Sequence, residues 1–447
     1  NIIAIDNIRS LSGGSAFGLL IVPIYLLLGV CFFVPVALIS AELATGWPKR
    51  GGLYVWVKEA LGHRWGLWVI FLQWIYNVIW YPTQVMFILT ALMYLLDVTI
   101  EQPLLYITTT SLMFVAITLI NIRGMRFSSV FSNAGAVIGT LVPMMVLVCL
   151  AVYWLATGHP AAADLSWASL NPSHEVIKNL SGYLTLVMFG LVGIEMSAVH
   201  ADEVTEPQKA YPKAILWSMG AILVSLILGT LALSVLLPSA EHDETLGVFK
   251  AIAHGFSLIP GASIWTTLLT IMIVFGSIAS LAAWIIGPGK GIHAASLDGV
   301  APRWLSPVNQ HGVPYRMMWL QVLIFVSLML LRQTLPPRLL FFILTAMTTQ
   351  LALVAYIVMF VSAIILRFTH AKTPRHYRVP GGNLGLILLS VLGISSCIIA
   401  IITGFVIPSE VIGDSVHISE WSMRGYMLLG LMVVGLAPLS FKRRSKP

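Results

Sequence analysis

The chain has 447 residues, of which 58% are hydrophobic and only 10% charged, and its formal net charge is +7. So few polar side chains cannot cover the surface of a water-soluble protein of this size, which excludes that class. The basic residues lie in short loops and not on an amphipathic face, which argues against nucleic acid as a partner. We therefore predict an all-α membrane protein with the lipid bilayer as its main solvent.

Apolar segments long enough to cross a bilayer recur along nearly the whole chain, since a spanning helix needs about 20 apolar residues. The sequence predicts twelve transmembrane helices in a single transmembrane domain. In chain order they are 1–11, 18–44, 65–96, 104–122, 128–157, 181–200, 212–237, 262–292, 315–332, 338–367, 384–407 and 421–441. Because the first segment is short, we expect an N-terminal stretch of the natural protein to precede it.

Positive charge predicts the orientation, because loops that stay in the cytoplasm are enriched in Lys and Arg. The loops after the even-numbered spans, together with the C-terminal tail, hold 19 of these residues, and the alternate loops hold 4. Both termini of this multi-pass protein are therefore expected on the cytoplasmic side of the cell (inner) membrane. Residues 245–259 have the apolar spacing of a helix and predict a short helix at the opposite surface.

Glu195 is a functional candidate because it lies well inside the apolar run of the sixth span. A carboxylate at the bilayer centre costs at least ~2.5 kcal/mol unless it faces a cavity or takes up a proton. Phe189, Gly190 and Gly193 precede it, and the glycines let the backbone leave helical geometry and offer N–H and C=O groups to a substrate. Close packing of helices through these glycines is the alternative explanation.

Arg9 is the corresponding basic candidate, in the apolar first span beside Ile5 and Asp6. This part of the chain lies five helices before the break expected in the sixth span, the separation that an inverted repeat with two interrupted helices requires. A guanidinium in the membrane needs an anionic partner. Two readings stay open: Arg9 pairs inside the protein with Asp6 or Glu195, or it binds an acidic substrate.

Aromatic and polar side chains of other spans are candidates for the lining of the same cavity. Trp80 and Asn77 lie in the middle of the third span and Trp284 lies in the eighth, where the bundle core is an equally good explanation. An aromatic ring in a cavity binds a substrate ammonium by cation–π contact. Thr348 belongs to a polar turn with Thr345, which either lines the cavity or bonds to its own helix.

Motifs of enzymes, cofactor sites and metal sites are absent from the sequence. It has no His-Glu-x-x-His and no Gly-x-Ser-x-Gly, and Gly287-Pro-Gly-Lys-Gly291 lacks the spacing of a phosphate loop. We therefore expect no enzymatic activity, no cofactor and no metal site. Sodium dependence stays open, because carbonyl and hydroxyl groups alone can form a sodium site.

Short motifs in a fixed order carry a resemblance to a known family. They include Ala41-Glu-Leu-Ala44, Gly51-Gly-Leu-Tyr-Val-Trp56, Gly193-Ile-Glu195, Tyr211-Pro212, Gly312-Val-Pro314 and Val379-Pro-Gly-Gly382. In this order the chain resembles the amino acid–polyamine–organocation superfamily, and within it the bacterial glutamate:GABA antiporter family most closely. The resemblance implies a LeuT-like fold with a five-plus-five inverted repeat, here 1–157 and 181–367, followed by two additional C-terminal helices in 384–441.

The same resemblance implies that the protein is an antiporter, which exchanges an amino acid such as glutamate or GABA for a related amino acid or amine by alternating access. Glu195 matches the family's helix-6 carboxylate and Phe189 its helix-6 aromatic gate. Trp284 matches the aromatic residue that closes over substrate in the related arginine/agmatine antiporter. The glycine-rich break of helix 1 is not visible in this sequence, and the long C-terminal plug of the acid-stress antiporter is absent from it.

Two alternatives to exchange remain at this stage. A proton-coupled amino-acid symporter would use protons in place of a counter-substrate, and a membrane sensor would bind its ligand without transporting it. The expected partners are a small amino-acid substrate, protons and lipid, with the protein as a monomer or homodimer. Uptake into preloaded liposomes distinguishes the exchanger from the symporter.

Overall fold

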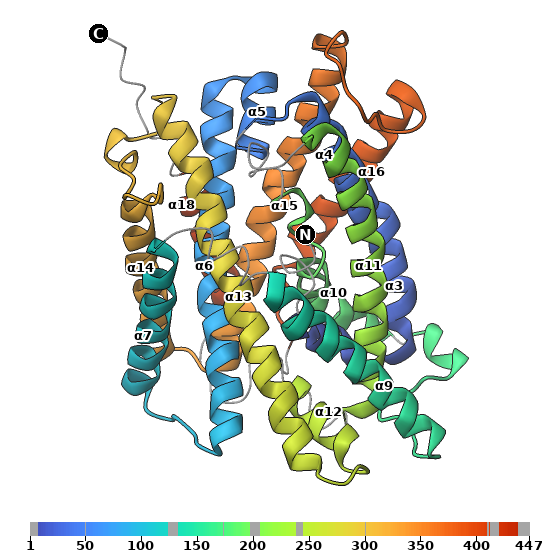
Figure 1. Cartoon of the computed structure of the whole chain (residues 1–447). Helices are drawn as coiled ribbons and strands as arrows, with labels where there is room; N and C mark the ends of the chain where they lie inside the picture. The colour runs from blue at the N-terminus through green and yellow to red at the C-terminus, as the bar shows by residue number, and fades with distance from the viewer. Residues whose placement is uncertain are drawn as a thin grey trace.

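The computed structural model describes residues 8–49, 51–123, 133–172, 174–196, 206–237, 245–299, 301–408, 411 and 420–436. Within these ranges every regular element is a helix (Figure 1). Nine of the helices described are long and apolar enough to cross a membrane: Gly18–Gly46, His63–Leu96, Pro103–Ile122, Asn133–Ala156, Lys209–Leu236, Ala262–Leu297, Tyr315–Gln333, Pro337–Thr369 and Gly382–Thr403. They match nine of the predicted spans to within a few residues at each end, which confirms the all-helical class.

The other three predicted spans are shorter in the described part of the chain. The first is represented by the helical turn η1 (Ile8–Leu11) and by α2 (Ser12–Ser15). The sixth contains the apolar segment Leu180–Met196. The twelfth contains α18 (Glu420–Leu436). Twelve transmembrane helices therefore remain a prediction.

Three long helices form the centre of the bundle (Figure 1): α6 (His63–Leu96), α13 (Ala262–Leu297) and α15 (Pro337–Thr369). At 34, 36 and 33 residues they are each about 50 Å long, whereas the hydrocarbon core of a bilayer is about 30 Å thick. In its most apolar stretch α6 is 78% buried, against 28% for α16 (Gly382–Thr403). The central helices are thus shielded by the rest of the bundle, and the outer helices meet the lipid.

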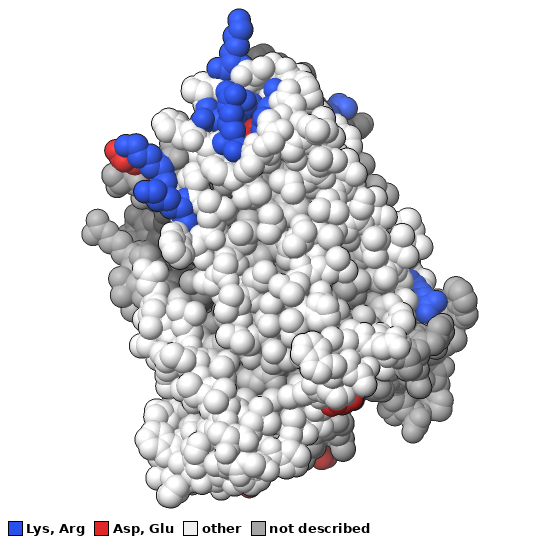
Figure 2. Space-filling view, turned by 90° about the vertical axis from the view of Figure 1, so that its right-hand side faces the viewer, with Lys and Arg blue, Asp and Glu red and all other residues white. Residues whose placement is uncertain are grey.

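The outer helices expose large apolar side chains. They are α3 (Ile21–Leu28), α7 (Pro103–Ile122), α9 (Val142–Ala156), α11 (Pro207–Leu236), α14 (Tyr315–Met329) and α16. Helix α4 (Val34–Gly46), which continues the segment of α3, is largely buried. Exposed residues include Leu27, Leu112, Val152 and Leu388. Most Lys and Arg side chains on the face drawn in Figure 2 gather at its upper end, and a broad uncharged surface lies below them. Such a surface is stable against lipid and not against water.

Pro288 in α13 is accommodated by a side chain of a neighbouring helix. A proline has no N–H, so it leaves the carbonyl four residues earlier without its helical partner. For Pro288 that carbonyl belongs to Trp284, and the Tyr81 hydroxyl donates to it at 3.1 Å. The helix therefore continues through Pro288, as expected for a proline that only bends a membrane helix.

The short helix predicted at 245–259 is present as α12 (Gly247–Phe256). Its apolar residues Val248, Phe249 and Ile252 are buried against the bundle, where α12 contacts α9, α11 and α13. The helix is confirmed, and its position at the membrane surface stays a prediction.

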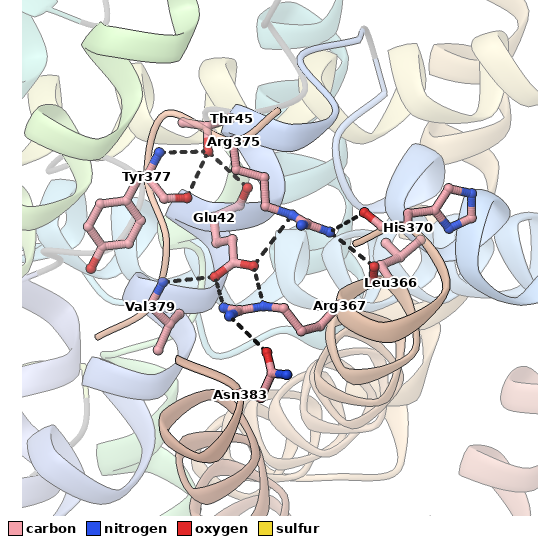
Figure 3. A network of polar contacts seen from close by, with 9 residues as sticks. All are labelled: Glu42, Thr45, Leu366, Arg367, His370, Arg375, Tyr377, Val379 and Asn383. Carbon is pink, nitrogen blue, oxygen red and sulfur yellow. Dashed lines mark hydrogen bonds and ion pairs between the residues drawn. The ribbon is translucent and has the colours of Figure 1, made fainter. Parts of the chain in front are cut away.

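A buried cluster of charges joins α4, α15 and α16 (Figure 3). Arg367 donates to both carboxylate oxygens of Glu42, and the Arg375 Nε lies 3.5 Å from Glu42 Oε1. The backbone N–H of Val379 also donates to Glu42, at 2.8 Å, and Arg367 reaches Asn383 at the start of α16. Glu42 and Arg367 are 3% and 6% exposed. The cluster therefore fixes the loop between α15 and α16 against the end of α4.

A second tie holds α5 (Leu53–Leu61) to the end of α13. The Tyr54 hydroxyl and the Lys58 ammonium both donate to Asp298 Oδ2, at 2.6 and 2.7 Å. Partial burial of Asp298 acts to raise its pKa, but the bonds from Lys58 and Tyr54 outweigh burial and hold that pKa below its usual value. The carboxylate is therefore charged at every physiological pH.

We predict that Glu42→Gln destabilises the protein by about 3–5 kcal/mol, because it leaves two arginines in a buried position without a full counter-charge. The measurement is thermal unfolding of the purified protein in detergent. Glu59→Gln is the matched control, since Glu59 forms only an exposed pair with Lys49 at 3.8 Å and should change stability by about 1 kcal/mol or less. Equal melting temperatures for wild type and Glu42→Gln would contradict the structural role of the cluster.

We predict that Asp298→Asn lowers stability slightly, by about 1 kcal/mol or less, as for other partly exposed ion pairs. A carboxylate whose pKa is lower in the folded state stabilises that state above the unfolded pKa of about 4, and the stabilisation is lost as the pH falls through the folded value. The difference in stability between the wild type and Asp298→Asn should therefore be the same at pH 7 and pH 5. Melting curves at both pH values test it, and a difference that vanishes at pH 5 would argue against it.

Candidate substrate site

The predicted break in the sixth span is present in the structure. Helix α10 (His174–Phe189) ends at Phe189, the next four residues are not helical, and a single helical turn follows at 194–196. Gly193 has φ of 120°, a conformation that residues with a Cβ rarely adopt. Its N–H donates to the hydroxyl of Tyr356 in α15 at 2.7 Å. The interrupted backbone is therefore held by a side chain of a central helix.

Glu195 lies directly after the break and is 1% exposed. The Tyr356 hydroxyl donates to Glu195 Oε2 at 2.5 Å, and Gln73 Nε2 of α6 donates to Oε1 at 3.4 Å. The Tyr356 hydroxyl thus accepts a hydrogen bond from the Gly193 N–H and donates one to Glu195. These two bonds use the donor and one acceptor position of the hydroxyl. This network fixes the carboxylate between α6 and α15 and links it to the unwound backbone.

Arg9 of η1 is also buried, with 3% of its surface exposed. Its Nη1 donates to Thr83 Oγ1 at 2.7 Å, and the Thr83 hydroxyl in turn donates to the carbonyl of Trp80 at 2.7 Å. The threonine proton is therefore directed away from the guanidinium, and an oxygen lone pair faces it. Two candidates beside Arg9, Ile5 and Asp6, lie outside the described residues, so the predicted Arg9–Asp6 pair stays a prediction.

Aromatic rings surround the Arg9 guanidinium. Its central carbon lies 5.1 Å from the ring centroid of Phe189, 5.0 Å from that of Phe341 and 6.0 Å from that of Trp80. Trp284 packs against Trp80 with 6.0 Å between ring centroids. The structure thus brings together four residues predicted for the site: Arg9, Trp80, Phe189 and Trp284. Their role in binding remains a prediction.

A small pocket opens beside this group, between the first segment, α10 and α15. It is lined by Arg9, Ser10, Gly13, Leu186, Phe189, Phe341 and Thr345. The first segment and the interrupted sixth span approach closely here, since a Cβ on Gly190 would lie 3.2 Å from Ser10 Oγ. The Thr345 hydroxyl is buried, and no hydrogen-bond partner is found for it in the part of the chain described. The pocket is therefore polar at Arg9, Ser10 and Thr345 and apolar elsewhere.

Two predicted residues bond to their own helices and do not line this pocket. The Thr348 hydroxyl donates to the carbonyl of Leu344 at 2.7 Å, which is the second of the two readings given for it above. Asn77 Nδ2 donates to the carbonyl of Gln73 at 2.6 Å. Asn77 therefore adjoins the Glu195 network through Gln73, and a direct role for either residue in substrate binding stays untested.

Sequence reasoning did not assign roles to several residues of the site. Tyr356 and Phe341 stand in the apolar tenth span without a local signal, and Thr83 is one of several hydroxyl residues in the third. Only the packing of α15 against α6 brings them to Glu195 and Arg9. Within the described ranges, no group of three or more His, Cys, Asp or Glu side chains is arranged to hold a metal ion.

Comparisons with known proteins agree with these features. The sequence model of the amino acid permease family matches residues 4–432. An uncharacterized transporter of Legionella pneumophila is 39% identical over 97% of this chain and 93% of its own length. A glutamate/gamma-aminobutyrate antiporter of Lactococcus lactis is 27% identical over 92% of this chain and 82% of its own length. A probable agmatine/putrescine antiporter of the same species is 24% identical over 80% of this chain and 76% of its own length.

The chain therefore belongs to the amino acid permease family, within the amino acid–polyamine–organocation superfamily. This is a family of multi-pass membrane transporters and not of enzymes. The resemblance inferred from the short motifs is confirmed, and the apolar helices agree with it.

We predict that Tyr356→Phe lowers stability by about 1–3 kcal/mol, because both the Gly193 N–H and the Glu195 carboxylate lose a buried hydrogen-bond partner. Thermal unfolding in detergent measures the change. Tyr94→Phe serves as the control, since Tyr94 lies at the end of α6 with its ring stacked on Phe249. If both variants melt at the wild-type temperature, the hydroxyl does not hold the break.

Proposed function

We propose that the protein is an amino-acid antiporter that exchanges an amino acid, such as glutamate or GABA, for a related amino acid or amine by alternating access. Membership of the amino acid permease family and the antiporters among its relatives support exchange. The observation that carries the proposal is the interrupted helix at Gly190–Gly193, which meets the first segment beside a pocket. Interrupted helices in transporters offer backbone groups to substrate.

In this mechanism the substrate occupies the pocket lined by Arg9 and Phe189, while the half-helix that contains Glu195 forms one of its gates. Opening moves this half-helix away from α6 and α15, which breaks the bonds of Glu195 to Tyr356 and Gln73. Because these bonds are buried, they are exchanged for substrate or water only when the gate moves. Glu195 thereby links occupancy of the pocket to closure of the helix.

The proposed architecture has twelve transmembrane helices in a five-plus-five inverted repeat. Its first repeat is 1–157, its second is 181–367, and the last two helices follow in 384–441. The interruption of the sixth span supports this division, because breaks at corresponding places of two repeats define the site in such folds. We place both termini in the cytoplasm from the distribution of Lys and Arg, and the protein in the inner membrane as a monomer or homodimer.

Proton-coupled uptake is the second candidate, and the burial of Glu195 favours it. A carboxylate at 1% exposure in a spanning segment takes up a proton when its hydrogen bonds are broken in a dry environment. In a symporter this proton would cross the membrane with the substrate, and in an exchanger it would only accompany the movement of the gate.

Reconstituted liposomes separate the two mechanisms. An exchanger accelerates uptake of labelled glutamate or GABA when unlabelled amino acid is inside, without any imposed gradient of pH. A symporter responds to an imposed pH gradient in empty liposomes. Failure of both assays with all common amino acids would refute transport by this protein and favour a sensor.

We predict that Glu195→Gln abolishes exchange or removes its dependence on pH, because the amide can neither ionise nor take up a proton. Initial exchange rates between pH 5 and pH 8 measure this. Glu59→Gln, which changes an exposed carboxylate outside the site, should keep the wild-type profile. A Glu195→Gln protein that exchanges normally at every pH would rule out the proposed role.

A further inference from the structure

We infer that the loop between α15 and α16, residues 370–381, binds the phosphate of an anionic phospholipid at the surface of the bilayer. The inference concerns the outside of the bundle and does not depend on which substrate the protein carries. Three observations carry it: an excess of positive charge in the loop, a rigid attachment of the loop to α4, and an apolar stripe on α16 that begins where the loop ends.

The loop carries more positive charge than the protein around it neutralises. It contains Lys372, Arg375 and Arg378 and no Asp or Glu. Glu42 of α4 is engaged by Arg367 and Arg375. Lys372 and Arg378 are exposed, and neither forms an ion pair or a hydrogen bond in the part of the chain that the structure describes. An anion from outside the chain would therefore supply the missing counter-charge.

The pKa of Arg375 is affected by this excess of charge. Burial is the largest cause that holds this pKa below its usual value, and Glu42 acts in the opposite direction. The positive charges of Arg367 and Arg378 lower the pKa of Arg375 further. The single carboxylate of Glu42 thus leaves a net repulsion among the arginines of the cluster, which a bound phosphate would relieve.

Contacts with α4 and with the end of α15 hold the loop in one conformation (Figure 3). The Val379 N–H donates to Glu42 at 2.8 Å, and the Tyr377 N–H donates to Thr45 Oγ1 at 3.4 Å. Arg375 donates to two backbone carbonyls at the end of α15, at 3.0 and 3.2 Å. A ligand therefore binds a loop that is already ordered, which lowers the entropic cost of binding.

The outer face of α16 places the loop at the level of the lipid headgroups. Leu384, Leu388, Val391, Ile398 and Ile402 are exposed, and their spacing puts them on one face of the helix. At 1.5 Å per residue this stripe is about 27 Å long, close to the ~30 Å thickness of the hydrocarbon core. Its first residue lies in the first turn of α16, so the loop lies directly beyond the edge of the hydrocarbon.

A phospholipid fits the loop and the stripe together. Its acyl chains pack along the exposed face of α16 while its phosphate reaches Lys372 and Arg378. Figure 2, drawn from the side on which α16 lies in Figure 1, shows Lys and Arg gathered at one end of a broad uncharged surface. A free anion would use the charge of the loop but not the stripe, so a membrane lipid matches more of what the structure presents.

Phosphatidylglycerol and phosphatidylcholine provide a matched pair of probes, because they differ in the net charge of the headgroup. We expect phosphatidylglycerol to raise the melting temperature of the purified protein in detergent more than phosphatidylcholine does, since a ligand of the folded state stabilises it. Titration of this shift gives the affinity. Sodium chloride at about 1 M should remove most of the difference between the two lipids, because it screens exposed charges.

Variants locate the preference in the loop. Lys372→Gln combined with Arg378→Gln should bind phosphatidylglycerol about 25-fold less tightly, or about 5-fold for each charge removed. Its melting temperature in phosphatidylcholine should stay at the wild-type value, because both side chains are exposed. Lys213→Gln combined with Arg303→Gln is the matched control, since it removes two exposed charges from other segments. The control should keep the wild-type affinity to within about 2-fold.

The inference is overturned if the two lipids stabilise the wild type equally, or if the control variant loses as much affinity as the loop variant. Inorganic phosphate at the same concentration should give no shift, and a shift as large as that of phosphatidylglycerol would identify a site for free anions instead. Should the double loop variant fail to fold, Lys372→Gln alone decides, with an expected loss of about 5-fold. A protein that binds phosphatidylglycerol as expected but exchanges no amino acid would overturn the proposed function and leave this inference intact.

Discussion

The hydroxyl of Tyr356 satisfies two demands that the membrane makes on the same stretch of chain. Lipid offers no hydrogen bonds, so an unwound backbone and a buried carboxylate both need partners inside the protein. Tyr356 accepts from the Gly193 N–H and donates to Glu195, and Gln73 completes the network from α6. The interrupted helix can therefore exist at membrane depth because α15 and α6 supply partners for its backbone and its carboxylate.

The same rule accounts for other polar contacts between the spanning helices. Pro35 has no N–H and leaves the carbonyl of Cys31 without its helical partner, and the Ser396 hydroxyl donates to this carbonyl. In the same way, the Tyr81 hydroxyl donates to the carbonyl of Trp284, four residues before Pro288. Buried charges also find their partners inside the protein: Glu42 is neutralised by Arg367 at the end of α15 and by Arg375 in the following loop. These contacts join helices far apart in the sequence, so each helix boundary depends on its neighbours.

The Glu42 cluster and the Asp298 tie have a different role from the pocket at Arg9. The Glu42 cluster joins the end of α4 to α15 and to the start of α16, and the Asp298 tie joins α5 to the end of α13. The pocket at Arg9 and the Glu195 network lie at the first segment and the interrupted sixth span. The alternating access proposed for this protein needs both, because rigid elements must transmit the movement of a half-helix while the bundle stays intact.

Composition and hydropathy determined the class of protein and nine of its spans, because the apolar length needed to cross lipid is a local property of the chain. They also predicted the break, since Gly190 and Gly193 before a buried carboxylate are a local signal. Tertiary structure alone decided the partners: Tyr356 for Glu195, Thr83 and Phe341 for Arg9, Thr345 in place of Thr348 at the pocket, and two arginines for Glu42. These contacts join residues of different spans, and only the packing of the helices determines which side chains meet.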